Sequence, residues 1–104
     1  MIRYVLAATL ASGAVFALSA LAQGADPNLG RNLAAACANC HGTSGVSVQG
    51  MPNLAGRERA YLVLQMQDFK TGKRPATIMH QLAKGYTDEQ IDALAAYFSA
   101  QKAR

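Results

Sequence analysis

Two cysteines and a histidine stand within five consecutive residues, Cys37-Ala38-Asn39-Cys40-His41, and the chain has no other cysteine. Two thiols separated by two residues on a turn of helix can each reach one vinyl group of a porphyrin, while the adjacent imidazole ligates the iron. The spacing therefore predicts one covalently attached c-type haem, with thioethers from Cys37 and Cys40 and with His41 as the proximal iron ligand. A chain that carries this group has to fold around it, because the apolar ring becomes part of the core.

Other uses of such a cysteine pair are a disulfide, two buried free thiols, a thioredoxin-like redox pair and half of a zinc site. A zinc site requires a second pair of ligands, but the only other histidine is His80. A thioredoxin-like pair belongs to a βαβ pattern, and little β-branched sequence precedes Cys37. A non-haem dithiol protein remains the alternative. If haem is attached, both sulfurs are thioethers and neither a free thiol nor a disulfide remains.

The N-terminal segment has the pattern of a secretory signal peptide. One basic residue precedes an apolar run over residues 4–18, and Ala20-Leu21-Ala22 is a small-x-small cleavage pattern. We therefore expect residues 1–22 to be a signal peptide, residues 23–104 to form one domain, and the mature protein to be periplasmic. The alternative is an uncleaved membrane anchor, although polar and small residues interrupt the apolar run.

The charge of the chain argues against a nucleic-acid partner. The chain has 10 Lys and Arg against 6 Asp and Glu, a formal net charge of +4. Cleavage would remove one arginine, and 9 minus 6 leaves +3 on the mature chain. Basic and acidic residues are interspersed, so no continuous basic face is expected, and export would separate the protein from nucleic acid.

The first part of the domain is expected to be a helix followed by a loop. Asp26 as N-cap and Pro27 in the first turn predict the start of a helix that runs toward Cys37. Residues 42–56 gather small and turn-forming residues and contain Met51-Pro52. We expect this segment to be a loop that wraps one edge of the haem.

Helical spacing returns after this loop. Three apolar residues recur at intervals of four and three: Leu62, Met66 and Phe69. They predict a helix over residues 57–69 that Gly72 ends. Residues 75–84 are expected to be ordered, without a definite type, and to be closed by Gly85.

The last predicted element is a helix with a capped N-terminus. Thr87-Asp88-Glu89-Gln90 has the pattern of a capping box, which opens an amphipathic helix that reaches about Gln101. The apolar face of this helix would consist of Ile91, Leu94, Ala95 and Phe98.

Over residues 25–102 the chain resembles the small class I cytochromes c. The resemblance rests on the haem motif, on Gly30, and on the segments Pro52-Asn53-Leu54-Ala55-Gly56 and Leu94-Ala95-Ala96-Tyr97-Phe98. It implies an all-α fold of helices packed around one covalent haem, and an electron-transfer protein rather than an enzyme. It also implies that Tyr97 packs against Gly30, since a residue without Cβ permits a close helix crossing. An ordinary core aromatic at Tyr97 would suit the same contact.

A second resemblance is more particular. The segments Phe69-Lys70-Thr71-Gly72, Thr77-Ile78-Met79 and Ala83-Lys84-Gly85-Tyr86 are similar to the cytochrome subunit of flavocytochrome c sulfide dehydrogenase. They are also similar to small periplasmic cytochromes that feed terminal oxidases. Both resemblances imply Met79 as the distal iron ligand, and they imply a flavoprotein dehydrogenase or a terminal oxidase as the redox partner.

Four residues of the mature chain could supply that distal ligand: Met51, Met66, Met79 and His80. Met66 lies on the apolar stripe of a predicted helix, where methionine commonly fills the core. Met51 lies in the loop close to the haem motif. His80 would give a bis-histidine site of lower potential. The resemblance favours Met79.

A histidine and a thioether would fill both axial positions of the iron, which suits a one-electron carrier. A haem enzyme or sensor with an open iron position is the alternative function. Six basic residues are expected around the haem crevice, where they would steer a redox partner: Arg57, Arg59, Lys70, Lys73, Arg74 and Lys84. Solvated helix faces would explain the same charges equally well.

Overall fold

The computed structural model describes residues 26–48 and 50–103, and within these ranges the chain is helical and has no strand. Helix α2 (Leu29–Ala34), a 3-10 turn (Ala35–Cys37) and α3 (Ala38–His41) follow one another directly, and a second 3-10 turn covers Thr43–Gly45. The longer helices come later in the chain: α4 (Arg59–Thr71), α5 (Met79–Lys84) and α6 (Asp88–Ser99). The predicted all-α fold is confirmed. The predicted signal peptide, residues 1–22, lies outside the described residues.

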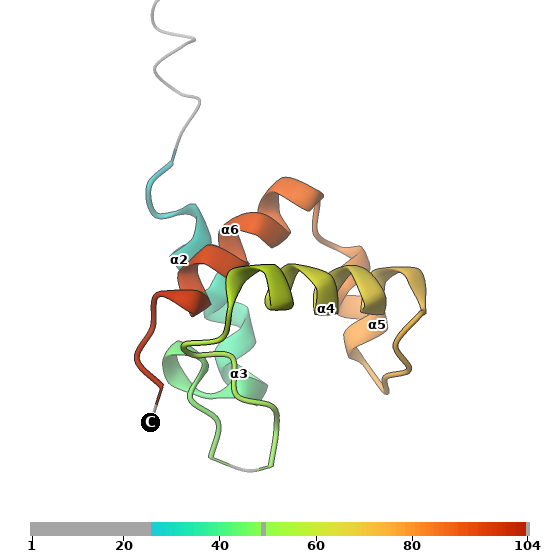
Figure 1. The fold of residues 1–104 in the computed structure, drawn as a ribbon, viewed down its shortest axis with the longest axis horizontal. Helices are drawn as coiled ribbons and strands as arrows, with labels where there is room; N and C mark the ends of the chain where they lie inside the picture. The colour runs from blue at the N-terminus through green and yellow to red at the C-terminus, as the bar shows by residue number, and fades with distance from the viewer. Residues whose placement is uncertain (1–25, 49, 104) are drawn as a thin grey trace, which may run out of the picture.

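Helix α6 lies between α2 and α4, and α5 lies against the C-terminal half of α4 (Figure 1). In this view, α6 lies above α4, and the long loop between α3 and α4 lies below it. Of the helices in residues 26–48 and 50–103, none combines the length and the apolar character that crossing a membrane requires.

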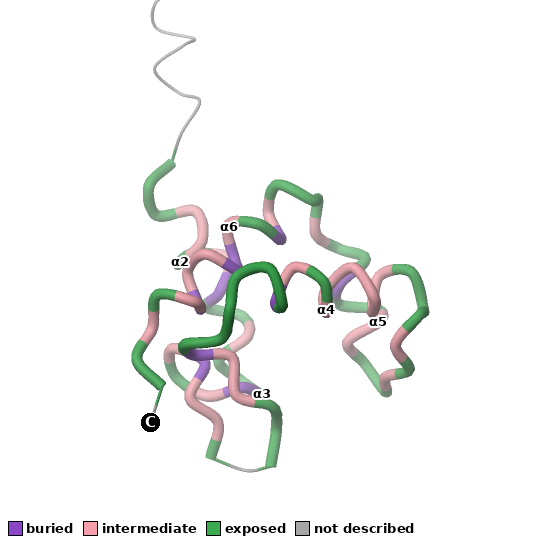
Figure 2. The backbone as a smooth tube through the Cα atoms, in the orientation of Figure 1, coloured by how far each residue is buried: buried purple, intermediate pink, exposed green. Residues whose placement is uncertain are grey.

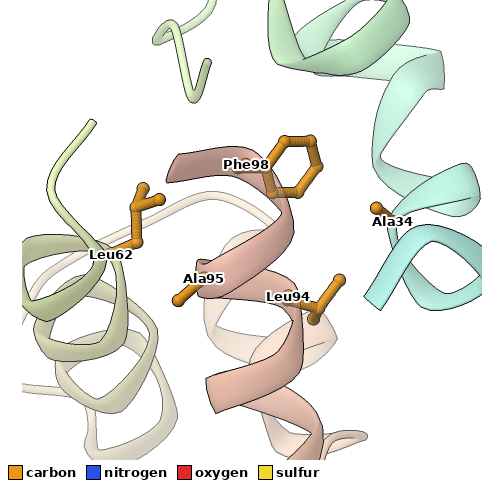
Figure 3. Packing of buried hydrophobic residues seen from close by; sticks show 5 residues of the cluster. All are labelled: Ala34, Leu62, Leu94, Ala95 and Phe98. Carbon is orange, nitrogen blue, oxygen red and sulfur yellow. The ribbon is translucent and has the colours of Figure 1, made fainter. Parts of the chain in front are cut away.

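The core is built around α6. Its four predicted apolar residues, Ile91, Leu94, Ala95 and Phe98, are all buried. Three of them pack with Ala34 of α2 and Leu62 of α4, as Figure 3 shows. Figure 2 shows buried stretches on α6 and α4, and further ones near α3 and in the loop before α4. The capping box is also confirmed, because the Thr87 side chain accepts from Gln90 N and the Gln90 side chain accepts from Thr87 N.

The crossing of α2 over α6 depends on Gly30. A Cβ at this position would lie 2.5 Å from Ala93 O and 3.1 Å from Tyr97 Cβ. The expected packing of Tyr97 against Gly30 is therefore confirmed, and the tightest approach is to a backbone carbonyl, which cannot rotate away. Only a residue without a side chain lets the two helices come this close.

Gly30→Ala is expected to lower the free energy of unfolding of the holoprotein by about 1–3 kcal/mol, because the new methyl group has to push α2 away from α6. Urea unfolding followed by circular dichroism measures this change. Asn32→Ala, on the exposed part of the same helix, is the matched control and should change the stability by less than about 0.5 kcal/mol. Equal stabilities of the two variants would contradict the close crossing.

The ends of the first helices differ from the prediction. Asp26 is not the N-cap: its side chain accepts a hydrogen bond from Asn28 N at 2.8 Å, and α2 starts at Leu29 with Asn28 as N-cap. An aspartate can satisfy a turn two residues on as readily as a helix end, so Asp26-Pro27 begins a turn before the helix. The prediction was therefore wrong by two to three residues at this end.

The predicted helix over residues 57–69 is displaced by two residues at each end and runs over Arg59–Thr71. Glu58 has an extended ψ of 134° and serves as its N-cap. Gly72 ends the helix as predicted, in the left-handed conformation with φ 81°. The segment predicted without a type contains a short helix, α5, and Gly85 follows its last residue.

Candidate functional site

A cavity of about 350 Å³ lies between the haem motif, the loop before α4, the inner face of α4, and α5 and α6. Its walls are mainly apolar. The three motif residues line it from one element, and the loop residues Met51–Leu54 and the segment Ala76–Met79 line it from two others. The structure thus brings the haem motif together with the segment Ala76–Met79, which lies about forty positions later in the sequence.

His41 is held in a defined orientation. It is only 9% exposed, and its Nδ1 lies 2.7 Å from Pro52 O. A carbonyl oxygen can only accept, so Nδ1 carries the proton and donates it to Pro52 O. The other ring nitrogen, Nε2, then has a free lone pair, which is the form in which histidine binds a metal ion.

The backbone next to His41 explains how Pro52 reaches it. Gly42 ends α3 with φ 82°, and its N–H donates to Ala38 O at 3.1 Å. A Cβ at Gly42 would lie 1.9 Å from Val46 O. The chain therefore turns back immediately after the motif, and residues 51–54 return to the cavity as the sequence predicted for this loop.

Both cysteines line the same cavity, and their sulfurs are not joined in a disulfide. Cys40 is exposed and Cys37 is half-buried. Burial, followed by the nearby Cys40, raises the pKa of the Cys37 thiol above its usual value. Cys37 therefore lacks the lowered pKa that marks a reactive thioredoxin-like cysteine.

The candidates for the distal ligand divide into two groups. Met51, Met66 and Met79 line the cavity, whereas His80 does not. Met66 also packs against the buried core, and Met51 is 42% exposed. Met79 is the first residue of α5 and lines the cavity together with Ala76–Ile78, which precede this helix. The structure therefore brings Met79 into the cavity that His41 lines and leaves its assignment as the ligand a prediction.

Only part of the expected basic ring lies at this cavity. Arg57 and Arg74 line it. Arg59 does not, because it makes an ion pair with Asp92 and its Nε donates to Asp92 Oδ1 at 3.0 Å. Arg59 therefore does not take the place expected for it at the cavity, and its partner lies 33 residues away in the sequence, on α6.

The lysines of the expected ring also have other positions. Lys70 Nζ donates to Tyr86 O at 2.5 Å and lies 3.8 Å from Asp88. Lys73 and Lys84 are exposed and do not line the cavity.

Sequence reasoning missed several lining groups: the Pro52 carbonyl and the side chains of Tyr61, Gln65 and Tyr86. The positions of Tyr61 and Gln65 next to Leu62 and Met66 place them on the inner side of α4, so helical periodicity carried a signal for these two. Tyr86 lies between α5 and α6 and is brought to the cavity by non-local packing. Burial, and secondarily Cys37, raises the pKa of the Tyr86 phenol.

These features fit a covalently attached haem. The cavity is apolar, two unpaired thiols stand at its wall, and a buried imidazole has one nitrogen fixed by a carbonyl and the other free. A thioether from Met79 lines the same space. Apolar walls with a soft sulfur donor and an imidazole are a donor set that suits haem iron.

Comparisons with known proteins agree with this geometry. The family model described as cytochrome c matches residues 28–102. The chain is 44% identical over 69 residues to the "Cytochrome subunit of sulfide dehydrogenase" of Chlorobaculum tepidum, a match that covers 66% of this chain and 63% of the relative. It is 41% identical over 102 residues to the "Thiosulfate dehydrogenase electron acceptor" of Stutzerimonas stutzeri, covering 90% of this chain and 47% of the relative.

Among solved structures, the cytochrome c4 of Acidithiobacillus ferrooxidans matches with a TM-score of 0.63 and 32% sequence identity. This match covers 71% of the present chain and 50% of the other. The chain thus spans less than two thirds of the length of each of these three proteins.

Proposed function

The chain belongs to the cytochrome c family, and on this basis we propose that it is a periplasmic one-electron carrier. It is a class I c-type cytochrome, and family membership implies a covalently attached haem c. In this proposal Cys37 and Cys40 would form the two thioethers to the haem, and His41 and Met79 would be the ligands of its iron. Residues 1–22 direct export and are removed, which leaves residues 23–104 as the cytochrome domain.

The arrangement around His41 carries this proposal. The hydrogen bond from His41 Nδ1 to Pro52 O leaves Nε2 available in a cavity that both cysteines also line. The haem supplies a one-electron Fe(III)/Fe(II) couple when bound. The hydrogen bond fixes the imidazole ring and makes it a stronger donor to the metal.

Met79 completes the coordination in this proposal. A thioether donates weakly to ferric iron, so it favours the ferrous state more than a second histidine would. With His41 and Met79 both bound to the iron, small molecules would not reach it, which supports electron transfer and not catalysis. The apolar walls of the cavity would exclude water from the haem. Like the thioether ligand, this exclusion would raise the reduction potential of the iron.

The electron donor is proposed from the relatives. One relative is named as a subunit of sulfide dehydrogenase and another as an electron acceptor of thiosulfate dehydrogenase. We infer that the donor is a dehydrogenase that oxidises a reduced sulfur compound, with a flavoprotein sulfide dehydrogenase as the first candidate. Delivery of electrons to a terminal oxidase is the alternative, in which the protein is a free shuttle.

Purification of the exported protein tests the proposal. The mass should equal that of residues 23–104 plus one haem, thiol reagents should modify neither cysteine, and the ferric spectrum should contain a thioether-to-iron charge-transfer band. The ferric protein should then be reduced by the sulfide-oxidising flavoprotein only when sulfide is present. A mass without haem would refute the whole proposal, whereas reduction only by a different donor would refute the partner alone.

A further inference from the structure

The outer face of α4 carries a groove that shares no lining residue with the haem cavity. It has a volume of about 440 Å³ and mainly apolar walls, and it lies between α4 and the N-terminal half of α6. Ala60, Leu64 and Gln67 follow one another at intervals of four and three along α4, so they form one stripe on the helix. The full set of lining residues, which we call the α4 groove, is Arg59, Ala60, Val63, Leu64, Gln67 and Asp92.

The centre of this stripe faces away from the haem cavity. Leu62 and Met66 line the cavity. Leu64 lies two residues from each of them, which places it about 200° around the helix. Its side chain is 52% exposed. A contact made at the α4 groove would therefore leave the haem cavity free.

Charged side chains mark the two ends of the α4 groove. At one end, Arg59 uses Nε and Nη2 on Asp92. At the other end, Gln67 Nε2 donates to Asp88 Oδ1 at 2.8 Å, and Lys70 Nζ lies 3.8 Å from the same oxygen. The Asp88 side chain is 85% exposed. Arg59 Nη1 and Asp88 Oδ2 have no hydrogen bond to residues 26–48 or 50–103, so each end keeps one charged group for a further partner.

A second copy of the chain has the charges that this arrangement requires. In a twofold dimer both partners use the same surface, so a groove with a cationic and an anionic end can pair with itself when the two grooves run antiparallel. With Leu64 of both copies at the twofold axis, the small Ala60 of one copy lies close to the longer Gln67 of the other. Arg59 of each copy then approaches Asp88 of the other copy.

We propose that the α4 groove is the surface through which two copies of the chain associate into a twofold dimer. Leu64 from both copies forms the apolar centre, and the two contacts between Arg59 and Asp88 set the antiparallel register. The two haem cavities lie on the outer sides of this pair, where each can meet a redox partner. One pair of helices buries less area than a standard interface, so the dimer is reversible and depends on concentration.

Sedimentation equilibrium of the exported holoprotein at increasing concentration tests the dimer. Leu64→Glu is expected to raise the dissociation constant at least about tenfold, because it places two negative charges at the twofold axis. Val48→Glu is the matched control, since it adds the same charge at an apolar side chain that is 84% exposed and lies outside the α4 groove. The control should keep the dissociation constant of the wild type. Equal dissociation constants for Leu64→Glu and the control would overturn the proposal.

A charge exchange tests the antiparallel register. Arg59→Glu and Asp88→Lys should each weaken association when studied alone, because each variant brings like charges together at both contacts. An equimolar mixture should associate again, since the new glutamate then meets the new lysine and Arg59 of one copy meets Asp88 of the other. Unchanged far-ultraviolet circular dichroism and haem absorption would show that both variants remain folded.

Two results of these measurements would contradict the dimer. A mixture that associates no more than its components would overturn the antiparallel pairing on which the proposal is built. A wild-type protein that stays monomeric up to about 1 mM would overturn it as well, and would leave the α4 groove to a partner of another kind. Neither result would affect haem attachment or the proposed electron-carrier function.

Discussion

Replacing Cys37 and Cys40 together by serine is expected to abolish haem attachment and to leave a chain without a cooperative unfolding transition. The reason is the size of the cavity relative to the protein. At about 24 cal/mol per Å³, a cavity of about 350 Å³ corresponds to at most roughly 8 kcal/mol. This is comparable with the about 5–15 kcal/mol that stabilises an entire small domain.

Mass spectrometry of the exported chain measures attachment, and near-ultraviolet circular dichroism with urea titration measures packing. Asn39→Ser is the matched control, because it changes the same turn at an exposed position and keeps both thiols. The control should attach haem and unfold cooperatively. A double serine variant that is compact and stable without porphyrin would show that the cavity walls do not need the ring to hold them apart.

Those parts of the fold that depend on neighbouring residues could be predicted from the sequence. The capping box at Thr87 and Gln90 uses groups three residues apart, and the buried face of α6 follows from a helical period over one element. The stop at Gly72 is equally local, because it needs only a left-handed backbone at one residue. The crossing at Gly30 was available from the family resemblance and follows from the absence of a Cβ.

Features that depend on distant partners could not be predicted. Arg59 lies outside the cavity and pairs with Asp92 on another helix, and the identity of this partner cannot be read from the residues around Arg59. Arg74 turns back to Gln65, nine residues earlier, across the end of α4. The Pro52 carbonyl meets His41 only because the loop returns after Gly42. Each of these contacts joins residues that are separated in the sequence, so each is set by tertiary packing.

Met79→Ala is expected to keep the haem attached and to lower the midpoint potential by on the order of 0.1 V, within the about 0.8 V that axial ligation spans among haem proteins. Alanine has no donor atom, so water or hydroxide would take the sixth position. Oxygen donors stabilise ferric iron more than a thioether does, which lowers the potential. The thioether-to-iron band should disappear from the ferric spectrum, and added cyanide or imidazole should bind without displacing a side chain.

Two further methionines line the same cavity and provide the controls for this experiment. Met51→Leu and Met66→Leu each remove a sulfur while keeping an apolar side chain of similar volume. Both should keep the thioether band and a potential close to that of the wild type, and so should His80→Gln, whose side chain does not line the cavity. Loss of the band in one of these variants, with the band retained in Met79→Ala, would move the distal ligand to the residue concerned. The experiment thus identifies the sixth ligand among residues that the cavity alone does not distinguish.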